Sequence, residues 1–158
     1  MLAGSDAQKK RWLPKLAMGE AIGCFGLAEG PSTPTAATIA TTARDGRLNG
    51  VKLPVPDGDV ADVAVVAART AEGAGERALS LYLVDLAGPG VSRSTLETID
   101  PTRSHARVVF DDARGELLGG TGRGWPLVRR LLDRAAVLMA FEQVGGAQAS
   151  LDMAREYA

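Results

Sequence analysis

Short strand-like runs, separated by turn signals, fill the middle of the chain, and the run at residues 38–43 alternates between polar and apolar residues. The runs predict β-strands at residues 22–28, 38–43, 47–53, 62–68, 78–84, 91–96 and 107–110. Asp45-Gly46 and Asp57-Gly58 are dipeptides typical of tight hairpin turns. Because no helical stretch separates the strands, the pattern predicts a mostly antiparallel β-barrel or sandwich over residues 22–118 and disfavours a parallel βαβ arrangement.

Helical periodicity is confined to the two ends of the chain, so the predicted fold class is α+β. Residues 8–18 read as the end of a helix, which Pro14 should bend or terminate. After Gly124 a long helical period places one apolar stripe on a single face, made of Val128, Leu132, Ala135, Met139, Gly146 and Met153. Such a stripe rarely stays exposed in a monomer, and we therefore expect a homo- or hetero-oligomer.

Composition narrows the class of protein without identifying it. The chain has 158 residues, 46% of them hydrophobic and 23% charged, which is ordinary for one globular domain. A net charge of -1 gives no positive field for nucleic acid or an anionic membrane surface. No apolar run is long enough to cross a bilayer, and the first residues do not resemble a signal peptide, so we expect a cytoplasmic location.

Several candidate chemistries are weak. Cys24 is the only cysteine and His105 the only histidine, which excludes an internal disulfide and a multi-histidine metal site. The glycine-rich run at residues 119–124 matches neither the dinucleotide nor the P-loop spacing, so it is interpreted as a connector. Glu142 falls within the apolar helical stripe. A carboxylate there needs either an arginine partner or a raised pKa of the kind that suits a general base, and both interpretations remain open.

Five sequence stretches together indicate a known family. They are QKKRWLPKL at 8–16, GCFGLAEGPST at 23–33, DGRLNGVK at 45–52, VFDD at 109–112 and EQVGGAQ at 142–148. In this order they resemble acyl-CoA dehydrogenases, and the second and third resemble the flavin-facing strands of the family's middle domain. The resemblance implies the end of an N-terminal helical domain at residues 1–21, a middle β-domain at 22–120, and the first helix of a C-terminal helical domain at 121–158.

The resemblance also implies which residues face an FAD cofactor. They are Phe25, Leu27, Ala28, Thr33, Pro34, Pro54 and Pro56. Ala28 stands where the family usually has a hydroxyl residue, and Pro34 stands where it has the serine of a glycine-serine-aspartate element. Pro54 and Pro56 replace a ring-stacking tryptophan and a nearby threonine. Fewer side chains are therefore expected to donate hydrogen bonds to the flavin here.

The family reaction is α,β-dehydrogenation of an acyl-CoA thioester, in which a carboxylate removes the α-proton and FAD accepts the β-hydride. The implied partners are an acyl-CoA thioester and an electron-transfer flavoprotein or similar acceptor. No catalytic residue and no metal ligand is predicted within residues 1–158, because Ala135 occupies one position where family members carry the glutamate and the other position lies beyond Ala158. Two alternatives stay open, a degenerate non-catalytic subunit and an interaction domain that partners an intact acyl-CoA dehydrogenase.

Overall fold

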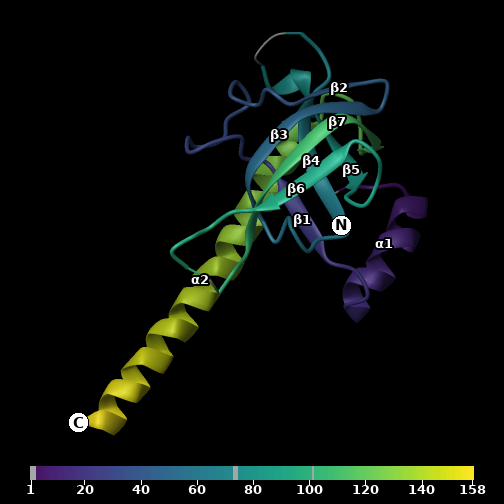
Figure 1. Ribbon diagram of the computed structural model, residues 1–158. Coiled ribbons are helices and arrows are strands. Elements are labelled where there is room, and N and C mark those ends of the chain that lie inside the picture. Colours follow the sequence, from purple (N-terminus) through teal and green to yellow (C-terminus); the bar gives the residue numbers. More distant parts are fainter. Residues whose placement is uncertain (1–2, 73–74, 101) are drawn as a thin grey trace. The chain divides into compact units, whose positions relative to one another are not determined.

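The computed structural model describes residues 3–72, 75–100 and 102–158, which form two units. The first unit spans Ala3–Trp125 and the second spans Pro126–Ala158. Residues 1–2 of the predicted N-terminal segment lie outside the described residues. Figure 1 shows the order of the elements, a short helix, a group of strands and a long C-terminal helix.

The N-terminal helix α1 spans Asp6–Met18. It begins at a capping box, because the Ser5 hydroxyl accepts the Gln8 amide and the Gln8 side chain accepts the Ser5 amide. It ends at Gly19, whose φ of 71° is left-handed and suits a residue without a Cβ. Of the two expectations for Pro14, a bend or the end of the helix, the second is wrong, since the helix continues to Met18.

Within the described residues seven strands follow, and each overlaps one of the predicted runs. They are β1 (Gly23–Gly26), β2 (Thr42–Arg44), β3 (Arg47–Pro56), β4 (Val63–Arg69), β5 (Leu79–Asp85), β6 (Val91–Thr95) and β7 (His105–Leu118). A single 3-10 turn, η1 (Glu76–Ala78), precedes β5. The predicted mixed α+β class with a β-rich middle and helices at the ends is therefore confirmed.

The strand pairings return to their starting point. β4 pairs with β2, β2 with β3, β3 with β7 and β7 with β5, and β5 pairs again with β4. β1 lies along β4, and β6 lies along β7. Among the described residues, five of these pairings are antiparallel, as predicted. The pairings of β1 and β2 with β4 are parallel and depart from the prediction.

Both parallel pairings have one cause, which is that β1 and β2 lie along the same edge of β4. Gly23 to Gly26 face the first part of β4, and Thr42 pairs with Arg69 at its end. The chain therefore leaves this edge after Gly26 and returns to it in the same direction at Thr42. Residues 27–41, here called the β1–β2 connection, lie outside the named strands and touch the sheet again at one isolated bridge, between Glu29 and Leu53.

Small and medium apolar side chains fill the core between these strands. Its cluster comprises Ala43, Leu48, Val55, Ala61, Ala64, Val66, Ala68, Tyr82, Val84, Leu86, Ala106, Val108, Phe110 and Ala113. Along β3 and β7 the core residues alternate with more exposed neighbours, whereas β4 and β5 are buried along most of their length. The residues of this core cluster therefore lie on the strands and the turns next to them, and none of them lies in the β1–β2 connection.

The C-terminal helix α2 spans Gly124–Tyr157. Its apolar side chains are largely exposed, with Leu138 at 71%, Phe141 at 74% and Val144 at 68%. Members of the predicted stripe are exposed as well, including Met139 and Met153. Among the described residues, neither helix combines the length and the apolar character needed to span a membrane.

The glycine run before α2 is shaped by close backbone approach. Gly122 has a φ of +70°, and a Cβ there would lie 2.6 Å from the Arg77 carbonyl oxygen. A Cβ on Gly124 would lie 2.8 Å from the backbone of Ser80, whose hydroxyl accepts the Gly122 amide at 2.9 Å. These glycines serve a packed turn, and a larger residue would need the turn to move.

Candidate functional site

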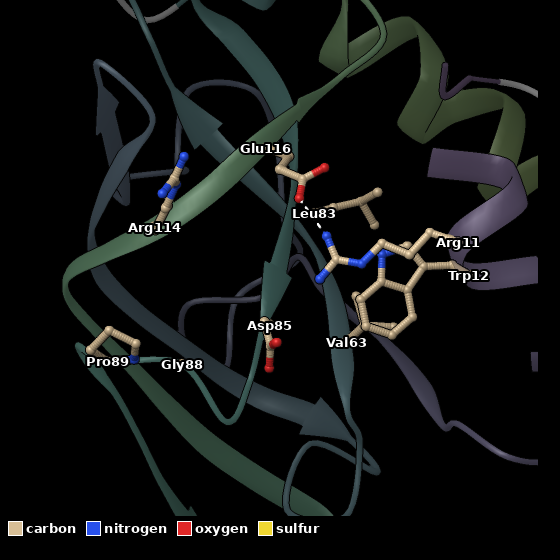
Figure 2. Close-up of a pocket in the computed structure, with 9 residues that line it drawn as sticks. All are labelled: Arg11, Trp12, Val63, Leu83, Asp85, Gly88, Pro89, Arg114 and Glu116. Carbon is tan, nitrogen blue, oxygen red and sulfur yellow. Dashed lines mark hydrogen bonds and ion pairs between the residues drawn. The ribbon is translucent and has the colours of Figure 1, made fainter. Parts of the chain in front are cut away.

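One cavity of the first unit lies between α1 and the sheet and has a volume of about 350 Å³ (Figure 2). Its lining is Arg11, Trp12, Val63, Leu83, Asp85, Gly88, Pro89, Arg114 and Glu116. The Arg11 guanidinium lies 2.8 Å from a Glu116 carboxylate oxygen and 5.0 Å from the centroid of the Trp12 ring. None of the residues predicted to face flavin lines this cavity, so it is not the predicted site.

A second cavity, of about 190 Å³, lies within the β1–β2 connection. Its lining is Glu29, Gly30, Pro31, Ser32, Pro34, Thr38 and Ile39. Pro34 belongs to the predicted flavin-facing set. This cavity is smaller than most ligand pockets, and it marks the inside of the connection rather than a complete binding site.

Backbone hydrogen bonds bring two of the predicted stretches together. The Leu53 amide donates to the Ala28 carbonyl at 2.8 Å, and the Gly30 amide donates to the Leu53 carbonyl at 2.8 Å. Residues 28–30 thereby pair with β3 at the point where Pro54 follows. Ala28 and Pro54 are far apart in the sequence, and this pairing sets their two stretches side by side.

The predicted flavin-facing residues differ in their exposure. Phe25, Ala28 and Pro34 are half-buried, whereas Thr33, Pro54 and Pro56 are exposed. Leu27 is only 8% exposed, and its carbonyl accepts a hydrogen bond from Lys52 at 3.3 Å. Six of the seven side chains are therefore available to a ligand, and Leu27 contributes mainly to packing.

A buried ion pair ties the β1–β2 connection to β3. The Lys52 side chain is fully buried, and its Nζ lies 2.6 Å from Glu29 Oε1. The same Glu29 carboxylate accepts the amides of Ala40 at 2.6 Å and Thr41 at 3.0 Å. One carboxylate thus joins the start of the connection, its end and the neighbouring strand.

Arg69 makes a second anchor for the connection. Its guanidinium donates to the Ile39 carbonyl at 2.7 and 3.1 Å and to the Ala36 carbonyl at 2.8 Å. Thr35 and Thr38 close a turn through their hydroxyls, which explains why the predicted strand at 38–43 begins only at Thr42. The base of the connection is therefore firmly held, while Ser32 and Thr33 at its tip stay exposed.

The environment of the ion pair moves both pKa values. Burial lowers the pKa of the Lys52 ammonium to about 8, although the hydrogen bond and charge of Glu29 oppose the change. Burial raises the pKa of the Glu29 carboxyl, but the hydrogen bond and charge of Lys52, together with the bonds from Thr41 and Ala40, outweigh burial. The Glu29 pKa is therefore lowered, and the pair is ionised at neutral pH.

The low Lys52 pKa predicts a pH dependence of stability. Between pH 8 and about 10.5, Lys52 is largely neutral in the folded chain but still protonated in the unfolded chain. The unfolded state binds more protons in this window, so the free energy of unfolding of the unaltered chain should rise with pH, and that of Lys52→Met should not show this rise. Urea unfolding of both proteins from pH 7.5 to 10.5 checks this. If the free energy of unfolding depends on pH in the same way in both proteins, the lowered pKa of Lys52 is refuted.

Thr41, next to the ion pair, faces Gly50 across β2 and β3. Its Oγ1 is buried and has no hydrogen-bond partner within the described part of the chain. A Cβ on Gly50 would lie 2.6 Å from this oxygen and 2.7 Å from the Thr41 Cα. Gly50 also has a φ of +149°, which a side chain rarely adopts.

Replacing Gly50 by alanine should therefore destabilise the fold by both strain and overlap. We expect a loss of about 3 kcal/mol in the free energy of unfolding, measured by urea denaturation. Gly30→Ala is the matched control, because Gly30 has a φ of +150° but open space around its Cβ position. Equal losses in the two variants would show that overlap with Thr41 contributes nothing.

The remaining candidates from the sequence take no part in this arrangement. Burial raises the pKa of the Cys24 thiol to about 11, and the His105 Nδ1 lies 3.3 Å from the Arg103 carbonyl. Glu142 lies on the exposed surface of α2, not in a buried stripe. Within the described part of the chain, no cluster of His, Cys, Asp or Glu is arranged to hold a metal ion.

Sequence reasoning missed the Glu29–Lys52 pair, although a signal for it exists. Lys52 falls on the same alternation along β3 as buried Leu48, so its side chain points inward. A buried lysine requires an acidic partner. The chain has 19 acidic residues, and the pattern does not say which of them is the partner.

Known proteins resemble this chain over nearly all of its length. No family model matches it. The short-chain specific acyl-CoA dehydrogenase of Rattus norvegicus mitochondria is 34% identical over 164 aligned positions, which cover 98% of this chain and 40% of that protein. The acyl-CoA dehydrogenase of Bacillus subtilis is 30% identical, with 98% and 43% covered. The chain thus spans about 40% of the length of the curated relatives it matches.

Solved structures agree with the sequence relatives. The acyl-CoA dehydrogenase of Geobacillus kaustophilus superimposes with a TM-score of 0.74 at 34% identity, covering 81% of this chain and 37% of that one. A glutaryl-CoA dehydrogenase of Mycobacterium smegmatis, solved in complex with FADH2, gives a TM-score of 0.63 at 37% identity, covering 71% and 29%. The resemblance that the sequence motifs indicate is therefore confirmed in both sequence and fold.

Proposed function

We propose that this chain, which is similar to acyl-CoA dehydrogenases over nearly its whole length, forms the FAD-facing part of such an enzyme. The observation that carries the proposal is the pairing of residues 28–30 with Leu53. It sets side by side the two stretches that the family resemblance assigns to the flavin. The whole protein would catalyse α,β-dehydrogenation of an acyl-CoA thioester.

The residues at this place fit FAD by their donors and their apolar surface. Ser32 and Thr33 are exposed at the tip of the β1–β2 connection, and within the described residues neither hydroxyl has a hydrogen-bond partner in the protein. Free hydroxyls and loop amides suit phosphate or ring oxygens. Phe25 and Pro54 offer apolar surface for a planar ring.

Each part of the chain has its own task in this proposal. FAD, when bound, would supply the acceptor for the substrate's β-hydride. Phe25, Ala28 and Pro54 would line the ring, and Thr33 and Pro34 would border the phosphates. Ala28 and Pro34 carry no hydroxyl. The backbone amide of Ala28 would replace the side-chain donor there, whereas Pro34 has no N–H and donates no hydrogen bond. No residue of this chain is assigned the role of the base.

The domain assignment belongs to the same proposal. Residues 22–120, whose strand pairings return to their starting point, would be the middle β-barrel, with 1–21 and 121–158 contributed to helical domains on either side. An acyl-CoA thioester and an electron-transfer flavoprotein would be the partners, in a cytoplasmic oligomer. The exposed apolar side chains of α2 support association with further helices.

Titration of FAD with the purified chain tests the cofactor part of the proposal. We expect the flavin fluorescence to change with a saturable dependence on protein concentration, because the ring moves from water to an apolar surface. Riboflavin, which lacks the phosphates, is the matched control and should bind more weakly. Absence of any saturable signal with FAD would reject FAD binding by residues 1–158.

A degenerate non-catalytic subunit remains the second candidate. Ala28, Pro34, Pro54 and Pro56 remove side-chain donors and a stacking ring together, which favours a chain that no longer needs tight FAD binding by itself. The two candidates differ in their complexes. If the chain co-purifies with a longer acyl-CoA dehydrogenase and binds no FAD by itself, the degenerate subunit is favoured. The same result would also fit an interaction domain that partners an intact acyl-CoA dehydrogenase.

A further inference from the structure

We propose that the Glu29–Lys52 ion pair is a positioning device that presents the FAD-facing residues of the β1–β2 connection. This inference rests on the proposed function, and it assigns a role to two residues that do not themselves face the flavin. Glu29 follows Leu27 and Ala28, and Lys52 precedes Pro54. The pair therefore lies at the root of both flavin-facing stretches.

The Glu29 carboxylate, held by Lys52, joins the two ends of a loop, and we call this arrangement the latch. Residues 30–39 leave the sheet after Glu29, and the chain returns at Ala40 and Thr41, whose amides both donate to the Glu29 carboxylate. The two ends of the loop therefore meet on one side chain. Lys52 holds that side chain from β3 through a bond of 2.6 Å and fixes Leu27 through its carbonyl at 3.3 Å.

A purely stabilising role would not call for buried charges at this place. Removing an ion pair from water costs free energy that two apolar side chains of similar size would not require. The carboxylate, however, accepts two amides and one ammonium at once, which an apolar side chain cannot do. The arrangement thus gives up stability for a fixed conformation of the connection.

The latch would hold the tip of the β1–β2 connection in one conformation before FAD binds. Thr33 and Pro34 lie between the two latched ends, so their position depends on where Glu29 holds Ala40 and Thr41. With the latch broken, these residues would have to be ordered during binding, and the cost of ordering weakens affinity. We expect FAD affinity to fall at least about 10-fold on loss of two charge-assisted hydrogen bonds.

The double variant Glu29→Leu with Lys52→Met separates positioning from stability. It leaves no unpaired buried charge, so it should unfold at nearly the same urea concentration as the unaltered chain. Its FAD affinity should nevertheless fall about 10-fold or more, and the amides of Ala40 and Thr41 should exchange hydrogen faster by a similar factor. The Gly115 amide, which donates to the Gly46 carbonyl at 2.8 Å, is the internal reference for exchange.

The matched control removes an ion pair of similar length at another place. Arg11→Met with Glu116→Leu breaks a 2.8 Å pair whose side chains are half exposed, and it should leave FAD affinity unchanged. If the latch variant keeps both its stability and its FAD affinity, the positioning role is overturned. If the unaltered chain binds no FAD, the proposed function fails, and the positioning role fails with it. This holds even if amide exchange shows that the latch orders the loop.

Discussion

Lys52→Met is expected to lower the free energy of unfolding by about 3 kcal/mol at pH 7, more than removal of any exposed charge in the chain. Lys52 is fully buried, and its ammonium is the ionic partner that neutralises the Glu29 carboxylate. Its replacement leaves a carboxylate that is only 13% exposed, with two amides but no cation. The measurement is urea unfolding of both proteins at pH 7.

Two comparisons make this expectation specific. Arg11→Met breaks an ion pair between half-exposed side chains and should cost no more than about 1 kcal/mol. Adding Glu29→Leu to Lys52→Met removes the uncompensated carboxylate and should recover most of the loss. A loss of less than about 1 kcal/mol for Lys52→Met itself would mean that the lysine is not held as a buried partner of Glu29.

Residues 1–158 alone are expected to show no measurable acyl-CoA dehydrogenase turnover, even with added FAD and an artificial electron acceptor. The reaction needs a carboxylate to remove the α-proton, and Ala135 stands at one position where the resemblance places that carboxylate. Absence of a general base typically costs about 100-fold to 10,000-fold in rate. Dye reduction in the presence of short-chain and medium-chain acyl-CoA thioesters is the measurement.

Glu142 provides the sharpest challenge to this expectation. It lies on α2 seven residues after Ala135 and is exposed to solvent. If the chain alone reduces the dye and Glu142→Gln abolishes that reduction, Glu142 is the base and the assignment of no catalytic residue is wrong. Glu156→Gln, at a second exposed carboxylate of the same helix, is the control for nonspecific effects.

Strand positions followed from the sequence because β3 and β7 alternate between buried and exposed residues, and β4 and β5 are short apolar runs bounded by turns. The ends of the strands were harder to predict from the sequence. β7 continues to Leu118, well past its predicted end at 110, because buried Ala113 and Gly115 resume the inward pattern after a left-handed Asp112. The pairing of β3 with β7 shifts register between Phe110 and Ala113, which is a β-bulge. A glycine gives no apolar signal even where it is buried, so the sequence pattern stops at this bulge although the strand continues.

The same limit applies to the candidate site. Short motifs predicted some of its residues, but contacts between distant residues could not be predicted. The resemblance placed Phe25, Ala28 and Pro54 near a flavin from short motifs, and their partial or full exposure to solvent is compatible with that role. The parallel edge made by β1 and β2, and the latch of Glu29 on Lys52, depend on contacts between residues that are more than 20 positions apart. Local patterns carry no information on which distant residues meet.

A hydrogen-exchange footprint of FAD on the chain tests the central claim most directly. If FAD binds where proposed, added FAD should slow the exchange of amides in residues 25–35 and 53–57, and leave the cavity of Arg11 and Trp12 unchanged. The free chain with riboflavin should show a weaker effect in the first stretch, where the phosphates would lie. Slower exchange around Arg11 and Glu116, with none at residues 25–35, would contradict the assignment of this face of the sheet to FAD.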